Sequence, residues 1–113
     1  MKIRRGDVIL VDLAPSKGTE QDKTRPAIVI QNDVGNEHSP TTIIAPLTSS
    51  YEEPYPTDVE LLSKDTCVEE DSVVQLNQIR TVSINHRIQD KFGSLSDRTM
   101  RSVDKAIRVS LGL

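Results

Sequence analysis

Short runs of aliphatic residues, many of them β-branched, alternate with polar stretches over most of the chain. Runs of this kind, bounded by Gly, Pro, Asn and Asp, are typical of β-strands. The pattern predicts strands over residues 6–13, 25–31, 42–47, 57–61, 72–76 and 78–82. Residues 84–92 fit no single pattern, although 87–89 are compatible with one more short strand.

The last part of the chain has a helical period. Its apolar residues recur three or four positions apart, at Met100, Val103, Ile107 and Leu111. This spacing predicts an amphipathic helix that begins near Asp97, whose charge favours the positive end of the helix dipole. Ser94 or Ser96 is suited to cap its start, and Gly112 is suited to end it.

Two features predict interruptions of the strands. Asn32–Asn36 is dense in residues that favour turns, so we expect a loop after the second strand. Pro46 lies inside the third predicted strand and lacks a backbone N–H. We therefore expect Pro46 near a sheet edge or a strand end.

The composition predicts a single domain spanning residues 1–113, with an aliphatic core. Aromatic residues make up only 3% of the chain, so burial of further apolar surface in a homodimer would help stability. No apolar run approaches the ~20 residues that span a bilayer, and no signal peptide is evident. Cys67 is the only cysteine, which excludes an internal disulfide and favours a cytoplasmic location.

The net charge of −3 is unevenly distributed. Residues 51–79 hold eight acidic residues and one lysine, whereas residues 80–113 hold seven basic and three acidic residues. An acidic total argues against strong non-specific binding to nucleic acid, which depends on neutralising phosphates. It leaves room for a local basic cleft, and the acidic block is equally compatible with a solvated face.

The most informative stretch is a polar segment, residues 18–24, followed by Arg25 and an apolar strand. The residue before a proline favours extended backbone, so Arg25 begins a rigid strand next to a loop. A guanidinium held there suits a phosphate, because it offers a planar fork of donors and stays charged. Glu20 in the loop is compatible with an acid/base partner or with a surface ion pair to Arg25.

Other chemistry has little support. His38 and His86 have no ligand spacing, so no metal site is predicted. Cys67 lies among acidic residues, which would raise a thiol pKa and blunt its reactivity. There is no glycine-rich phosphate loop. What remains is Glu20, Arg25 and Thr48, on two polar loops that each adjoin an apolar strand.

Several motifs, in this order and spacing, resemble the MazF/PemK family of toxin endoribonucleases along essentially the whole chain. They are Arg5-Gly6-Asp7-Val8, Gly18-Thr19-Glu20-Gln21, Arg25-Pro26, Ile30-Gln31-Asn32-Asp33, Pro46-Leu47-Thr48-Ser49, Asp71-Ser72-Val73 and Gln78-Ile79-Arg80-Thr81. The resemblance implies a mainly β fold, an SH3-like, partly open barrel with a C-terminal helix, and a homodimer. It further implies metal-independent, cofactor-free cleavage of single-stranded RNA, leaving a 2′,3′-cyclic phosphate and a 5′-hydroxyl. A MazE-like antitoxin with a disordered acidic tail is the implied inhibitor.

By the same resemblance, Arg25 and Thr48 match the catalytic arginine and threonine of the family, and Glu20 matches a glutamate given an acid/base role in some members. Arg25 suits stabilisation of the phosphorane, whereas arginine is a poor base, so the identity of the general base stays open. The other residues expected to hold RNA lie on or near the same loops: Lys17, Gln21, Lys23, Ser49, Ser50, Tyr51 and Gln78. Tyr51 is equally suited to stack on a base or to pack on the barrel.

Two other functions compete with the ribonuclease hypothesis. A CcdB-like toxin has the same barrel and poisons DNA gyrase without cutting RNA, and such a binder has no need of the Arg25/Thr48 pair. An inactive SH3-like interaction module would need none of Glu20, Arg25 and Thr48. The sequence specificity is expected to depend on Glu69-Glu70 and on Thr57-Asp58, at the end of the second polar loop.

Overall fold

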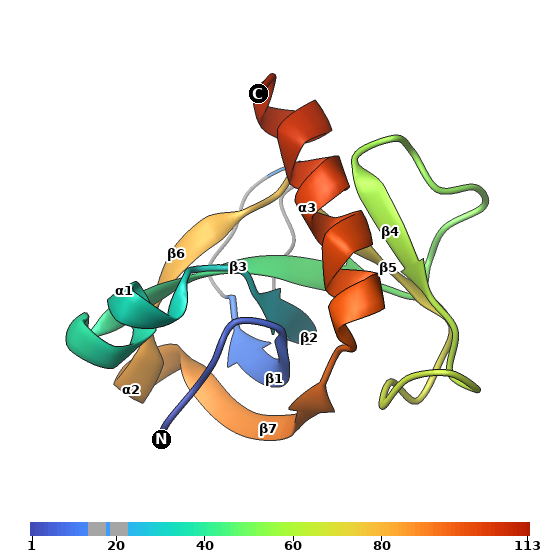
Figure 1. Ribbon diagram of the computed structural model, residues 1–113. Helices are drawn as coiled ribbons and strands as arrows, with labels where there is room; N and C mark the ends of the chain where they lie inside the picture. The colour runs from blue at the N-terminus through green and yellow to red at the C-terminus, as the bar shows by residue number, and fades with distance from the viewer. Residues whose placement is uncertain (14–17, 19–22) are drawn as a thin grey trace.

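The computed structural model describes residues 1–13, 18 and 23–113 and shows a curled antiparallel sheet with one long helix across it (Figure 1). The strands are β1 (Asp7–Asp12), β2 (Thr24–Val29), β3 (Thr41–Thr48), β4 (Asp58–Leu61), β5 (Ser72–Gln75), β6 (Arg80–Ser83) and β7 (Ile88–Ser94). The helices are α1 (Asp33–His38), α2 (Ile84–Arg87) and α3 (Asp97–Leu111). The predicted mainly β fold with a C-terminal helix is confirmed.

The sheet runs in the order β4-β5-β3-β2-β1-β7, with β6 also paired to β3. Strand β3 is its centre: β2 pairs along one edge, while β6 and then β5 pair along the other. Pro46 lies in this central strand and not at a sheet edge, but it is the third residue from the end of β3, which agrees with the strand-end alternative of the expectation. The position is tolerated because the partner of the second edge changes there, from β6 opposite Ile44 to β5 opposite Leu47.

Alternation along the strands sends aliphatic side chains to both faces of the sheet, giving two buried clusters. The first includes Val8, Ile28 and Leu47 together with Met100, Val103 and Ala106 of α3. The second includes Ile9, Val11, Ala27, Val29 and Ile44. Both faces of the central strands are therefore buried, which explains their nearly continuous apolar sequence.

Helix α3 begins and ends as the sequence predicts. The hydroxyl of Ser96 accepts a hydrogen bond from the Thr99 N–H, and Gly112 has the left-handed conformation with φ +73°. Met100 and Val103 are buried, whereas Leu111, at the C-terminal end of the same apolar stripe, is 52% exposed.

Residues 33–38 form helix α1 where the sequence predicts a loop. Asn32 caps the helix by accepting from the Gly35 N–H. The buried side chain of Asn36 accepts from the Thr42 hydroxyl at 2.6 Å and donates to the Gln31 carbonyl oxygen. Turn-forming residues are thus used for capping and for buried hydrogen bonds, which favours one short helix over an open turn.

Residues 84–92 divide into helix α2 and most of β7, and β7 pairs with β1. The short strand expected at 87–89 is part of this longer strand, which begins at Ile88. Pairing with β1 gives β7 its extended conformation, since its sequence is mostly polar and its burial is low.

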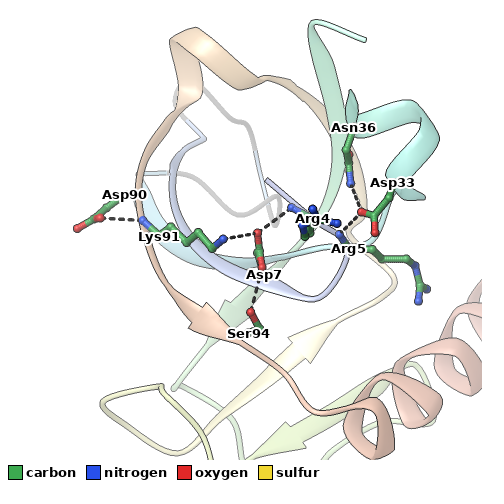
Figure 2. A network of polar contacts seen from close by, with 8 residues as sticks. All are labelled: Arg4, Arg5, Asp7, Asp33, Asn36, Asp90, Lys91 and Ser94. Carbon is green, nitrogen blue, oxygen red and sulfur yellow. Dashed lines mark hydrogen bonds and ion pairs between the residues drawn. The ribbon is translucent and has the colours of Figure 1, made fainter. Parts of the chain in front are cut away.

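A polar network joins the start of the chain to the sheet and to α1 (Figure 2). The buried carboxylate of Asp7 accepts from the Arg4 N–H at 2.7 Å and from the Ser94 hydroxyl at 3.1 Å, and it pairs with Lys91 Nζ at 3.1 Å. Asp33 accepts from the Arg5 N–H at 2.7 Å. These contacts fix the N-terminal segment against β7 and α1.

Candidate active site

Arg25 is the second residue of β2, where it pairs with Val11 of β1 and is half buried. Two residues before Arg25, the carbonyl oxygen of Lys23 accepts a hydrogen bond from the Leu13 N–H at 3.0 Å. Lys23 itself is exposed and has a positive φ of 67°. The guanidinium of Arg25 therefore extends from a paired strand that adjoins a turn.

Thr48 is the last residue of β3 and pairs with Val73 of β5. Its side chain is buried, at 8% exposure, and Oγ1 accepts a hydrogen bond from the Ser50 N–H at 3.1 Å. This turn contact uses the oxygen as an acceptor. Within the described residues the hydroxyl hydrogen has no acceptor, so Thr48 remains able to donate one hydrogen bond.

The pairing of β2 with β3 brings Arg25 close to the end of β3. Strands β2 and β3 pair Ala27 with Pro46 and Ile28 with Ala45, so Arg25 lies two residues past the last pair on β2 and Thr48 lies two residues past it on β3. Arg25 lines the same hollow as Leu47 and Ser49, the two residues that flank Thr48 in the chain.

Two adjoining hollows flank this point. A hollow of 430 Å³ is lined in part by Arg25, Leu47, Ser49, Glu69 and Glu70. A larger hollow of 1030 Å³ is lined by Thr48, Ser49, Ser50, Tyr51, Glu52, Glu53, Tyr55, Asp58, Val73, Gln75, Asn77 and Gln78. Ser49 lies between the two and belongs to both.

The structure thus groups most of the residues that the sequence analysis selects. Five of them line the larger hollow: Thr48, Ser49, Ser50, Tyr51 and Gln78. Arg25 lines the smaller one, and Lys23 lies two residues before it in the chain. Glu20, Gln21 and Lys17 lie outside the described residues.

Sequence reasoning missed the acidic and amide lining of the larger hollow. Glu52, Glu53 and Asn77 are exposed residues that line it, and Tyr55 at its margin is 71% exposed. The dense acidic block from residue 51 onward was the available signal. Only the fold shows that part of this block faces a hollow beside Thr48.

Arg80 also has a contact that the sequence did not indicate. Its Nη1 donates to the Leu13 carbonyl oxygen at 3.2 Å, and Nη1 of Arg87 donates to the Asp12 carbonyl oxygen at 3.4 Å. Two cationic side chains therefore hold the end of β1.

Tyr51 lies against β4: its hydroxyl donates a hydrogen bond to Glu60 Oε2 at 2.8 Å. This hydrogen bond, together with desolvation and the nearby carboxylates of Glu60 and Asp71, raises the pKa of Tyr51 to about 12. The neutral phenol is therefore favoured. The hydrogen bond contributes to stability below the unfolded pKa of ~10, and this contribution is lost as pH rises through the folded value.

Replacing Glu60 by alanine is expected to lower the pKa of Tyr51 from about 12 toward its ordinary value, because the principal acceptor and a negative charge are both removed. Titration of the ring ¹³Cζ resonance of Tyr51 by NMR measures the change. Glu37→Ala, on exposed α1, serves as the control for general loss of a carboxylate. An unchanged Tyr51 titration in Glu60→Ala would contradict the assignment.

The described residues include no group of three or more His, Cys, Asp and Glu side chains arranged to hold a metal ion. No helix in this part of the chain is long and apolar enough to cross a membrane.

The open, curled sheet with a C-terminal helix is the fold of solved MazF toxins, and the family model gives the class, a toxin of a type II toxin–antitoxin system. Residues 4–111 match the family described as "PemK-like, MazF-like toxin of type II toxin-antitoxin system", and the chain belongs to this family.

Individual relatives agree with this assignment. The chain is 46% identical to Endoribonuclease MazF of Staphylococcus saprophyticus over 112 residues, which cover 98% of this chain and 92% of that protein. Its fold matches a crystal structure of MazF from Deinococcus radiodurans with a TM-score of 0.82 at 20% identity, covering 100% and 99% of the two chains. It also matches a mycobacterial endoribonuclease in complex with its cognate antitoxin, with a TM-score of 0.80 at 22% identity, covering 98% and 96%.

Proposed function

We propose that this chain is a sequence-specific endoribonuclease toxin that cuts single-stranded RNA without a metal ion. The observation that supports the proposal is the placement of Arg25 and Thr48 on two adjoining hollows of 430 and 1030 Å³ that share Ser49. The volume of the larger hollow is at the upper end of the ~300–1000 Å³ typical of ligand pockets, which is ample for a nucleotide. Membership of the toxin family and the 46% identical endoribonuclease support the same activity.

The reaction is an internal transesterification. The ribose 2′-oxygen loses its proton and attacks phosphorus, forming the O2′–P bond, while the P–O5′ bond breaks and the 5′-oxygen gains a proton. The products are a 2′,3′-cyclic phosphate and a 5′-hydroxyl end. Negative charge accumulates on the non-bridging oxygens in the transition state, and donors fixed in advance at that place supply a large part of catalysis.

Arg25 and Thr48 are suited to this charge. The Arg25 guanidinium presents several N–H donors to a phosphate, and it is carried by a strand held between two neighbours. Thr48 donates its hydroxyl hydrogen, while the Ser50 N–H fixes the oxygen in place. Glu20 is proposed as an acid/base group, and the division of proton transfers between it and other groups is left open.

The proposed RNA contacts come from Lys17, Gln21, Lys23, Ser49, Ser50, Tyr51 and Gln78. The toxin is proposed to act in the cytoplasm as a homodimer and to be blocked by a MazE-like antitoxin. The antitoxin's disordered acidic tail would replace RNA phosphates near Arg25 and Lys23, at the cost of becoming ordered. In the mycobacterial relative, the solved complex contains the cognate antitoxin.

Incubation of the purified protein with a long, weakly structured RNA in EDTA is expected to give discrete cuts. Mapping the fragment ends should show 5′-hydroxyl and 2′,3′-cyclic phosphate groups, because the 2′-oxygen and not water attacks phosphorus. The aligned cut sites give the recognition sequence. Absence of cutting by folded protein would contradict the proposal and would favour a toxin that binds its target without cleaving it.

A further inference from the structure

The larger hollow has the wrong charge for a phosphate. Among the described residues its lining contains three carboxylates, of Glu52, Glu53 and Asp58, and neither lysine nor arginine. A phosphate entering it would meet like charges, which is unfavourable. If RNA lies across Arg25 and Thr48, the group that enters this hollow is a base.

The internal contacts show which carboxylates remain available. Asp58 accepts from the Tyr55 N–H at 2.9 Å, and Glu60, next to the hollow, accepts from the Tyr51 hydroxyl. Within the described residues, Glu52 and Glu53 accept no hydrogen bond from the protein. Two carboxylates on the β3–β4 connection are therefore available as acceptors beside Thr48.

Carboxylates distinguish bases by the exocyclic amino group. A carboxylate accepts from the N4 amino group of cytosine, and an amide pairs with adenine through N6 and N7. Guanine also carries an amino group, whereas the only polar hydrogen on the pairing edge of uracil, on N3, lies between two carbonyl oxygens, so a carboxylate that accepts it also approaches O2 or O4. A uracil O4 directed at Glu52 or Glu53 would face a like partial charge, with no donor except a side-chain amide such as that of Asn77.

We propose that the hollow lined by Glu52, Glu53 and Asn77 reads the base next to the cut and selects a base with an exocyclic amino group against uracil. This inference rests on the proposed ribonuclease function and adds the specificity of the same site. Tyr55, 71% exposed at the margin of the hollow, supplies an aromatic face on which the base stacks.

The test uses short oligonucleotides that cannot be cut, with a 2′-O-methyl ribose at the mapped cut site. Each of the four bases is placed in turn at the two positions beside the cut, and affinity is measured by fluorescence anisotropy. At one of these positions the native protein is expected to bind uracil about tenfold more weakly than cytosine or adenine, the size of one good base contact.

The double variant Glu52→Gln/Glu53→Gln should reduce this discrimination to about twofold or less, because a glutamine amide both donates and accepts and so accommodates uracil O4. Glu37→Gln, which removes an exposed carboxylate on α1 far along the chain from the hollow, should leave the base preference unchanged. Equal binding of all four bases by the native protein, or discrimination retained in the double variant, would overturn the inference.

The experiment distinguishes failure of the base-reading site from failure of the proposed ribonuclease function. A native protein that cuts RNA in EDTA and shows no preference against uracil keeps the ribonuclease function and loses only the base-reading site. A native protein that neither cuts RNA nor binds the uncleavable oligonucleotides refutes both.

Discussion

Arg25→Ala is expected to lower the rate of RNA cleavage by about 10²–10³-fold, the usual effect of removing one fixed donor to a developing oxyanion. The variant should fold normally, since the β1–β2 and β2–β3 backbone pairings do not depend on this half-buried side chain. Single-turnover cleavage of a fluorescent oligonucleotide measures the rate, and circular dichroism confirms the fold.

Two further variants distinguish the loss of the guanidinium donors of Arg25 from the loss of a positive charge. Arg98→Ala removes an exposed arginine from α3 and is expected to cut at the parental rate. Arg25→Lys keeps the positive charge but loses the planar fork of donors, so its rate should fall between those of the parent and the alanine variant. A folded Arg25→Ala protein that cuts at the parental rate would remove Arg25 from the site.

The strands and the final helix were predictable because their signals are local. A β-branched run or a three-to-four-residue apolar period reflects burial on one element, and burial on one element is visible in sequence. The caps of α3 were predictable for the same reason: Ser96 bonds three residues ahead, and Gly112 acts through its own backbone freedom.

The features that could not be predicted, helix α1 and the position of Pro46, depend on contacts between segments distant in the chain. Helix α1 is favoured by the bond of Asp33 with the Arg5 N–H, 28 residues away, and by the buried bond of Asn36 with Thr42. Pro46 is typical of a sheet edge, and the sequence does not reveal that β3 changes its pairing partner from β6 to β5 near this residue.

The candidate site likewise combines residues with a local signal and an arrangement that depends on distant segments. Arg25 and Thr48 could be selected by residue type, position and resemblance, but only the pairing of β2 with β3 places these residues, 23 positions apart in the chain, on adjoining hollows. The acidic lining of the hollow likewise depends on where the β3–β4 connection folds. Charge along the sequence indicated an acidic block and gave no indication that Glu52 and Glu53 lie beside Thr48.

Asp7→Ala is expected to destabilise the protein by about 1–3 kcal/mol, the usual cost of removing the acceptor shared by several hydrogen-bond donors. The Asp7 carboxylate is 2% exposed and is shared by the Arg4 N–H, the Ser94 hydroxyl and Lys91 Nζ (Figure 2). Its removal leaves three donors without their acceptor where the chain enters β1 and where β7 ends. Urea unfolding followed by circular dichroism, at one fixed protein concentration, measures the loss.

The exposure of each partner predicts an asymmetry within this network. Lys91→Ala should cost less than Asp7→Ala, because the lysine side chain is 39% exposed and its loss leaves Asp7 with two other donors. Asp90→Ala, which removes an exposed neighbour that only accepts from the Lys91 N–H, should change stability by about 0.5 kcal/mol or less. If Asp7→Ala unfolded at the same urea concentration as Asp90→Ala, the network would make no measurable contribution to the free energy of unfolding. The expected order, Asp7 first, Lys91 second and Asp90 last, follows from burial, because the cost of an unpaired polar group rises as water is excluded from it.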